Sequence, residues 1–276
     1  MKTYKQIVKE YSRKLKDITH IPQKETEILL LYIIEQNIIW LHINYNKPCS
    51  IDTEQKLKKL IEKRSVNYPI EYITKKATFY GEIFKVEQGV LIPRPETEIL
   101  VDKAIEILEK IENPTIIEIG TGSGIISIMI AKLIPTSKII AVDINKKALI
   151  LAEQNAIKHN VNNQITFLQS DLLSNISQDK FNVLISNPPY IASNFTLPLN
   201  VKYEPSNALF GGDIGDELLK KIIIEFSKKD IKYLLCEMGY DQKKPLNNFI
   251  NKNISYKSLE FYKDLSNLDR GFILSV

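Results

Sequence analysis

The sequence has few of the residues from which disulfide frameworks and metal centres are built. Its 276 residues include only two cysteines and three histidines. Cys236 stands inside an apolar run, which is typical of a small buried hydrophobic side chain, and Cys49 lies far away in the sequence. This usage excludes a disulfide-stapled scaffold and a cysteine-ligated zinc site. The scattered histidines give no ligand spacing, so we expect no metal.

A long apolar run is also missing. The longest uninterrupted aliphatic or aromatic stretch, Ile28–Ile34, ends at Glu35, whereas a helix needs ~20 apolar residues to cross a bilayer. Residues 1–10 contain no apolar segment of the kind found in a secretory signal. We therefore expect a cytoplasmic protein with no membrane partner.

Charge of one sign is in excess only near the N-terminus. The whole chain carries 37 Lys+Arg and 33 Asp+Glu, a net charge of +4. Residues 1–75 contain 14 Lys+Arg and 9 Asp+Glu, hence +5, and the remainder contains 23 and 24, hence −1. A basic N-terminal third is typical of a protein with an acidic or nucleic-acid-containing partner, or of a solvated basic face in a lysine-rich chain.

Glycine is absent from residues 1–80, which favours a compact helical unit at the N-terminus. Apolar residues recur with helical spacing in the first segment, at Tyr4, Ile7, Val8, Tyr11 and Leu15. Residues 26–41 are apolar on nearly all sides, which predicts one buried central helix. A further helix is expected to begin at Ile51, with Asp52 or Thr53 as its N-cap.

From residue 76 onward the pattern changes. In residues 76–93, apolar and polar residues alternate, and Gly81 and Gly89 interrupt the pattern. This predicts a β-hairpin linker. Beyond it we expect a helix whose apolar face carries Leu100, Ala104, Leu108 and Ile111. Strands and helices then alternate, which predicts an α/β catalytic domain over residues 94–276 with a doubly wound, mostly parallel sheet. The predicted strands are 115–119, 138–143, 165–169, 181–186, 231–237 and 271–276, with helices such as 124–133 and 146–159 between them.

A glycine-rich turn follows the first strand of this domain. Glu118–Gly124 reads E-I-G-T-G-S-G, and Asp143 ends the next strand. Glycines let the backbone approach a ligand beside a helix N-terminus, and a carboxylate at that strand end can accept hydrogen bonds from ribose hydroxyls. Ile125 stands where a dinucleotide-binding turn needs its third glycine, and no Gly-Lys-Ser/Thr phosphate loop occurs. The remaining G-x-G-x-G resembles motif I of class I methyltransferases, which use S-adenosylmethionine.

Further polar residues are expected at the same edge of the sheet, because ligands of open parallel sheets bind outside the carboxyl ends of the strands. Asp171 follows the third strand and matches the position at which such enzymes usually bind the adenine amino group. Leu172 can pack on the base. An alternative interpretation makes Asp171 the N-cap of a following helix.

The fourth strand ends in Asn187-Pro188-Pro189-Tyr190. A primary amide or exocyclic amine is a poor nucleophile because its lone pair is delocalised. The side-chain oxygen of Asn187 and the carbonyl of Pro188, fixed by the proline ring, supply two acceptors for its hydrogens, and Tyr190 offers a flat face. Catalysis of this kind depends on orientation and placed dipoles rather than on a strong base.

Together with motif I, this corner is similar to that of methyltransferases acting on planar amino groups. Four further segments resemble the HemK/PrmC family. They are 91–98 (L-I-P-R-P-E-T-E), 203–212 (Y-E-P-S-N-A-L-F-G-G), 237–242 (E-M-G-Y-D-Q) and the K-D-L…D-R of 263–270. Its members methylate the glutamine of the Gly-Gly-Gln loop in class 1 peptide-chain release factors. The resemblance spans the chain and implies a seven-stranded Rossmann-like sheet, a helical N-terminal domain over 1–75 that docks the release factor, and the linker over 76–93.

The resemblance also implies which residues act. Asn187, Pro188, Pro189 and Tyr190 would clamp the glutamine amide, with Asn187 contacting cofactor and substrate. The cofactor, S-adenosylmethionine, would be bound by Glu118, Gly120, Thr121, Gly122, Ser123, Gly124, Asp143, Asp171, Leu172 and Asn187. Residues 93–98 and the Glu204-Pro205 loop would wall the site, and 263–270 receives no chemical role. Leu172 replaces an aromatic residue found in some relatives.

Two other functions stay open at this stage. An adenine-directed DNA or RNA methyltransferase shares Asn-Pro-Pro-Tyr, but it usually needs a base-flipping apparatus and a strongly basic groove, whereas residues after 75 sum to −1. A non-catalytic S-adenosylmethionine-binding scaffold would not need the intact corner. We expect a monomer without direct nucleic-acid contacts, since no extended exposed apolar face is evident.

Overall fold

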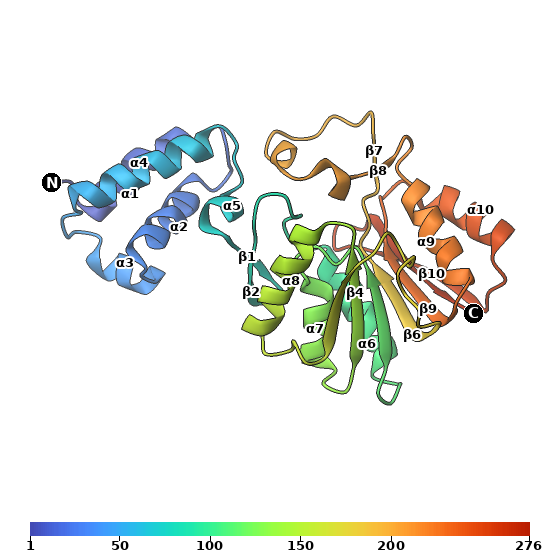
Figure 1. Cartoon of the computed structure of the whole chain (residues 1–276). Helices are drawn as coiled ribbons and strands as arrows, with labels where there is room; N and C mark the ends of the chain where they lie inside the picture. The colour runs from blue at the N-terminus through green and yellow to red at the C-terminus, as the bar shows by residue number, and fades with distance from the viewer. The chain divides into compact units, whose positions relative to one another are not determined.

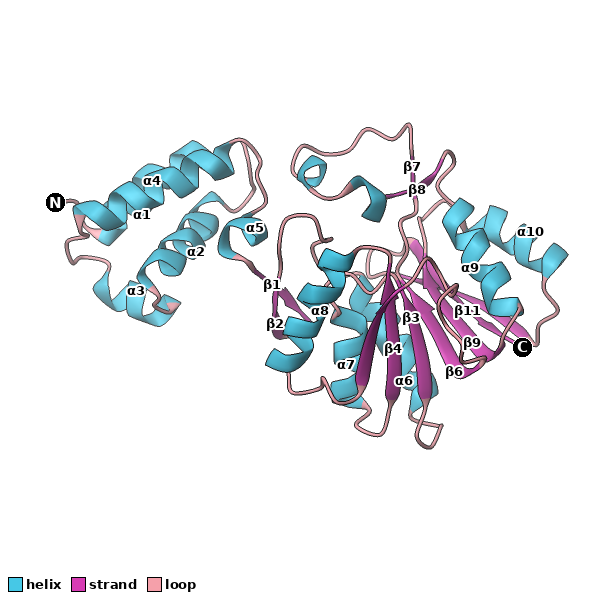
Figure 2. Ribbon diagram, viewed as in Figure 1, coloured by secondary structure: helices cyan, strands magenta, loops and turns pink.

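The computed structural model describes all residues, 1–276, and the chain forms two compact units. The first unit comprises Met1–Lys76 together with Leu197–Tyr203, and the second comprises Ala77–Thr196 and Glu204–Val276. Figures 1 and 2 show helices in the first unit and a sheet flanked by helices in the second.

The first unit is helical, and its core is made of the apolar positions that recur with helical spacing. Ile7, Val8, Tyr11 and Leu15 are buried there, as predicted. A buried ion pair joins two helices, because the Arg64 guanidinium donates to both carboxylate oxygens of Glu25 (2.6 and 3.2 Å). The helices are α1 (Tyr4–Ser12), α2 (Pro22–Ile34), α3 (Ile38–Asn44), α4 (Ile51–Ser65) and α5 (Ile70–Thr74).

The predicted single helix over residues 26–41 is wrong. Helix α2 ends at Ile34 because Glu35 adopts a left-handed conformation (φ 53°), and the Asn37 side chain then caps α3 by accepting from the Trp40 amide (2.9 Å). No single helix of the chain is long and apolar enough to cross a membrane, and α2 and α3 pass such a test only as a pair bent by 96°.

The predicted cap of α4 is also wrong. Ser50, not Asp52 or Thr53, caps this helix, since its hydroxyl accepts from the Thr53 amide (3.1 Å). Asp52 lies within the first turn instead, where a carboxylate favours the positive end of the helix dipole.

The second unit contains a seven-stranded, mostly parallel sheet, so the predicted fold class is confirmed. Its strand order is β10-β11-β9-β6-β3-β4-β5, and only β11 runs antiparallel to its neighbours, β10 and β9. Strand order therefore reverses between β3 and β6, which is where ligands bind in such sheets. The strands are β3 (Thr115–Ile119), β4 (Lys138–Asp143), β5 (Ile165–Gln169), β6 (Lys180–Ser186), β9 (Asp230–Glu237), β10 (Ser258–Lys263) and β11 (Asp269–Ser275).

Helices cover both faces of this sheet. One apolar cluster packs α6, α7 and α8 on one face, and another packs α9 and α10 on the opposite face, at the right of Figure 1. The helices are α6 (Thr97–Leu108), α7 (Ile125–Leu133), α8 (Lys146–Lys158), α9 (Glu217–Ser227) and α10 (Lys243–Asn253). Ile111, expected on the face of α6, lies beyond its end.

Two small strand pairs complete the unit. Strands β1 (Lys76–Phe79) and β2 (Glu82–Lys85) pair within the predicted linker, and residues 86–93 continue without regular structure. Strand β7 (Ile191–Ala192) directly follows the Asn-Pro-Pro-Tyr corner and pairs in parallel with β8 (Phe210–Gly212).

Candidate active site

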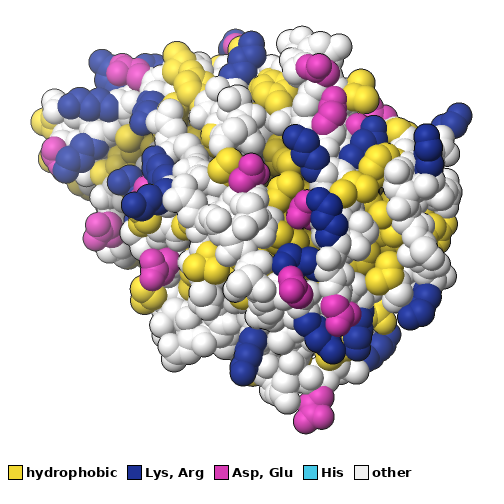
Figure 3. Space-filling model, turned by 45° about the vertical axis from the view of Figure 1, so that its right-hand side comes forward, with side chains coloured by type: hydrophobic (Ala, Val, Ile, Leu, Met, Phe, Trp, Pro, Cys, Tyr) yellow, Lys and Arg dark blue, Asp and Glu magenta, His cyan; other side chains and the backbone are white.

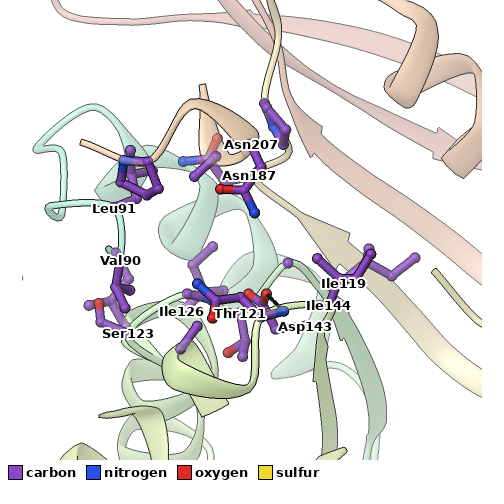
Figure 4. Close-up of a pocket in the computed structure, with 18 of the residues that line it drawn as sticks. Val90, Leu91, Ile119, Thr121, Ser123, Ile126, Asp143, Ile144, Asn187 and Asn207 are labelled. Carbon is purple, nitrogen blue, oxygen red and sulfur yellow. Dashed lines mark hydrogen bonds between the residues drawn. The ribbon is translucent and has the colours of Figure 1, made fainter. Parts of the chain in front are cut away.

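A cavity of about 320 Å³ lies at the carboxyl ends of β3, β4, β5 and β6, within the second unit. It therefore occupies the point at which the strand order reverses. Figure 4 shows Asp143 and Thr121 on one side of this cavity, Asn187 and Asn207 on the opposite side, and Val90 and Leu91 along a third. Predicted residues from four strand ends thus line one space, whereas the predicted residues Glu118, Gly124, Pro188 and Tyr190 lie outside its lining.

The glycine-rich turn forms one wall of the cavity. Gly120 and Gly122 have positive φ angles (73° and 57°), and a Cβ atom at either would meet nothing within 4 Å. Glycine is required there by the backbone conformation, and the open space beside it leaves room for a ligand. Gly124 (φ 84°) has a different role, because a Cβ there would lie 3.0 Å from Ala152 and Ile128, at the packing of α7 against α8.

Glu118 braces this turn from behind. Its Oε2 accepts hydrogen bonds from the hydroxyl of Thr121 (2.8 Å), between Gly120 and Gly122, and from that of Ser127 in the first turn of α7. Its other oxygen has no partner, and Glu118 is not among the residues that line the cavity. Complete burial raises the pKa of Glu118 to about 7.

This shifted pKa makes stability depend on pH. Between the usual pKa of 4.5 and about 7, folded Glu118 keeps a proton that the unfolded chain has lost. The free energy of unfolding therefore falls as pH rises through this window, by about 3 kcal/mol for this group. Urea unfolding of wild type and Glu118→Gln at about pH 5 and pH 8 should show wild type losing stability relative to the variant. An equal difference at both pH values would contradict this assignment.

Asp143 connects the glycine turn to the next strand. Its Oδ2 accepts from the Gly122 amide (2.9 Å) and its Oδ1 accepts from the Asn145 amide (2.8 Å). Burial raises the pKa of Asp143, and these backbone hydrogen bonds oppose that effect. Each carboxylate oxygen keeps a further lone pair for a ligand hydroxyl, and the side chain lines the cavity.

Asp171 and Leu172 also line the cavity, directly after β5. Residues 171–175 form turns rather than a helix, so the interpretation of Asp171 as a helix N-cap is wrong. Leu172 adopts a left-handed conformation (φ 51°) and packs against the apolar cluster of α9 and α10. The adenine-binding roles of these two residues stay predictions.

Asn187 directly follows β6, and a hydrogen bond to the protein fixes the nitrogen of its side-chain amide. Its Nδ2 donates to the Thr97 hydroxyl (2.9 Å), which in turn donates to Glu237 Oε2 (2.7 Å). The Tyr190 hydroxyl donates to the other oxygen of Glu237 (2.9 Å). Burial raises the pKa of Glu237, while the two hydroxyls and the charge of Arg270 oppose that effect.

Within the Asn-Pro-Pro-Tyr corner, Asn187 and Pro189 line the cavity, whereas Pro188 is buried and lies outside its lining. The corner is fixed from several sides. Gln242 Nε2 donates to the Tyr190 carbonyl (2.8 Å), and a Cβ on Gly211 would come within 2.5 Å of the Pro189 carbonyl. Such close backbone contact explains Gly211 of β8, whereas a Cβ on Gly212 would meet the side chain of Glu217.

Thr97 and Glu237 have no role in the sequence prediction, although both fall in segments that carry the family resemblance. Two other segments, for which the sequence indicates no chemical role, also have clear contacts. Buried Glu204 accepts from the Ile92 amide (3.0 Å) and from the Arg94 guanidinium, so it fastens the 91–94 wall of the cavity. Arg270 pairs with Asp264 (2.7 Å) in the turn between β10 and β11.

The fold of the chain is that of class I methyltransferases. The catalytic domain of hMettl16, solved with a MAT2A 3'UTR hairpin, superposes with a TM-score of 0.59 at 13% identity, over 87% of this chain and 92% of that one. The ribosomal protein L11 methylase of Lactobacillus delbrueckii subsp. bulgaricus gives 0.50 at 21% identity, over 71% and 86%. A Methyltransferase small domain model matches residues 97–200.

More specific similarity lies in the sequence. A PrmC N-terminal domain model matches residues 6–74. The release factor glutamine methyltransferase of Fusobacterium nucleatum is 36% identical over 91% of this chain and 73% of that protein. The release factor glutamine methyltransferase of Clostridium acetobutylicum is 32% identical over 98% of this chain and 97% of that protein. That of Aquifex aeolicus is 30% identical over 94% of this chain and 93% of that protein. The chain belongs to the release factor glutamine methyltransferase family, HemK/PrmC, and the predicted resemblance is confirmed.

Proposed function

We propose that this methyltransferase transfers the methyl group of S-adenosylmethionine to the side-chain amide nitrogen of the glutamine in the Gly-Gly-Gln loop of class 1 release factors. The observation that carries the proposal is the hydrogen bonding of the Asn187 side-chain amide. Its amide nitrogen is held by Thr97, and its oxygen accepts no hydrogen bond from the protein at the cavity wall. An acceptor of that kind suits a substrate that presents N–H groups.

The cavity residues fit the cofactor. Open space beside Gly120 and Gly122 accommodates a ligand against the backbone, and Asp143 has lone pairs for two ribose hydroxyls. Thr121, Ser123 and Leu172 line the same space. When bound, S-adenosylmethionine would supply an electrophilic methyl group and would leave as S-adenosylhomocysteine. No cluster of metal-ligating side chains occurs in the chain.

The residues of the corner then orient the acceptor amide. Asn187 Oδ1 would accept one hydrogen of the glutamine amide at the cavity wall, and we propose the carbonyl of the next residue, Pro188, as the second acceptor although Pro188 lies outside the lining. Together they would fix the amide nitrogen toward the methyl group. Placed dipoles favour the more tetrahedral nitrogen that forms as the bond is made. The extra proton is lost only after the nitrogen is alkylated, when it is acidic, so a strong base is not required.

The helical unit is proposed to dock the release factor away from the reacting glutamine, with the enzyme acting as a cytoplasmic monomer. On the face in Figure 3, Lys and Arg side chains are interspersed with Asp and Glu. This face therefore shows no continuous basic surface of the kind that attracts a DNA or RNA duplex.

The experiment compares acceptors for a labelled methyl group. Purified enzyme is incubated with labelled S-adenosylmethionine and unmethylated release factor, a release factor with glutamate replacing the loop glutamine, DNA, or ribosomal RNA. Label should enter only the unaltered release factor. Label in DNA or RNA but not in the release factor would overturn the proposal in favour of an adenine-directed enzyme.

A further inference from the structure

A line of hydrogen bonds behind Asn187 joins three distant parts of the chain. Asn187 follows β6, Thr97 begins α6, and Glu237 ends β9. Thr97 and Glu237 are almost fully buried (0% and 1% exposed), so their hydrogen bonds are not shared with bulk water. Thr97 also touches the cavity, which places the line directly behind the site wall.

The direction of each hydrogen bond in this line is determined by Glu237. Both of its oxygens accept from hydroxyls, those of Thr97 and Tyr190. The single hydroxyl proton of Thr97 is therefore used toward Glu237. Only a lone pair of Thr97 remains for Asn187, so the NH2 group of Asn187, and not its oxygen, must face Thr97.

We propose that Thr97 is a positioning residue for methyl transfer, whose hydroxyl, oriented by Glu237, fixes the Asn187 amide with Oδ1 toward the acceptor nitrogen. The inference deepens the proposed function and rests on it. Without Thr97, Asn187 can rotate by half a turn and present its NH2 group to the substrate. Two sets of N–H donors would then face each other, and the substrate amide would lose one of its acceptors.

The test separates this role from general stability. Thr97→Val keeps the side-chain shape and removes the hydroxyl, and we expect kcat to fall about 10- to 100-fold through misorientation of the amide. The Kd for S-adenosylmethionine should change much less than kcat, because the main cofactor contacts come from the glycine turn and Asp143. Thr97→Ser restores the hydroxyl and should restore kcat. If Thr97→Val does not fold, Thr97→Ala replaces it in the comparison with Thr97→Ser, because alanine also lacks the hydroxyl and has a smaller side chain.

Thr26→Val is the matched control. Thr26 is also fully buried and donates a hydrogen bond, to the Pro22 carbonyl (2.8 Å), but it lies in helix α2 of the first unit. It should lose stability without losing kcat. A double-mutant cycle gives a further readout, because Thr97→Val should have no effect on kcat when Asn187 is already alanine. Additive losses, or equal kcat for Thr97→Val and wild type, would overturn the proposal.

The orientation can also be measured without turnover. In NMR spectra of the wild-type protein, the side-chain amide protons of Asn187 should show nuclear Overhauser effects to the methyl group of Thr97, and Thr97→Ser provides the assignment control. Absence of that contact overturns the positioning role even if the release factor is methylated. Conversely, the contact with no methylation of the release factor retains the orientation and rejects the proposed substrate.

Discussion

Replacing Asn187 with alanine is expected to lower kcat for methyl transfer by about 30- to 1,000-fold, or ~2–4 kcal/mol of transition-state stabilisation, as for other placed polar groups. The substitution removes the acceptor oxygen at the cavity wall and leaves the Thr97 hydroxyl without its donor. Because the neutral amide group makes its contribution where the nitrogen reacts, the loss should appear in kcat rather than in the KM for the release factor.

Asn187→Asp is the informative companion to this variant. Aspartate has nearly the same shape, but it cannot donate to Thr97, whose proton is already directed toward Glu237. It should therefore be as inactive as the alanine variant, although it retains an acceptor oxygen. Steady-state kinetics with saturating cofactor measures both. Near-normal turnover of Asn187→Ala would contradict the amide clamp.

Replacing Asp143 with alanine is expected to weaken binding of S-adenosylmethionine by about 100- to 1,000-fold. Two causes add. The variant loses the carboxylate that would bind ribose, and it releases the Gly122 and Asn145 amides that shape the glycine turn. Hydrogen bonds to a charged group contribute about 1.5–3 kcal/mol each, which is the basis of this magnitude. Isothermal titration calorimetry with S-adenosylmethionine measures the change.

Asp143→Asn distinguishes the two causes. Its amide offers one acceptor oxygen instead of two, so one of the two backbone amides loses its partner, and we expect an intermediate affinity. Asp179→Ala is the charge control, because Asp179 is an exposed residue paired with Lys229 (2.6 Å) outside the cavity lining. Wild-type affinity in Asp143→Ala would reject Asp143 as a cofactor residue.

Most of the sheet could be predicted because its central strands are continuous apolar runs bounded by turns. Strands β3, β4 and β5 have the predicted bounds, while β6, β9 and β11 differ only at their ends. Strand β10 was missed because it is an edge strand in which only Tyr262 is buried, so it shows little apolar signal. The interruption after Ile34 was missed because a left-handed glutamate leaves no trace in apolar periodicity.

The candidate site likewise has a part that the sequence predicts and a part that it does not. Residues at strand ends can be placed from the sequence, because parallel topology brings strand ends to one edge. The contacts of Thr97 with Asn187 and Glu237 span 90 and 140 positions, and they depend on how α6 packs beside β9. Likewise, the contact of Glu204 with Arg94 spans 110 positions. Contacts of that range become visible only in the folded structure.

The measurement that tests the central claim most directly is the location of the transferred methyl group. Unmethylated release factor is treated with the enzyme and S-adenosylmethionine, digested, and mapped by tandem mass spectrometry. We expect one added methyl group on the side-chain amide of the Gly-Gly-Gln glutamine, and none with the Asn187→Ala enzyme under the same conditions. A methyl group on any other residue of the release factor, or an unmodified glutamine after prolonged reaction, would contradict the account.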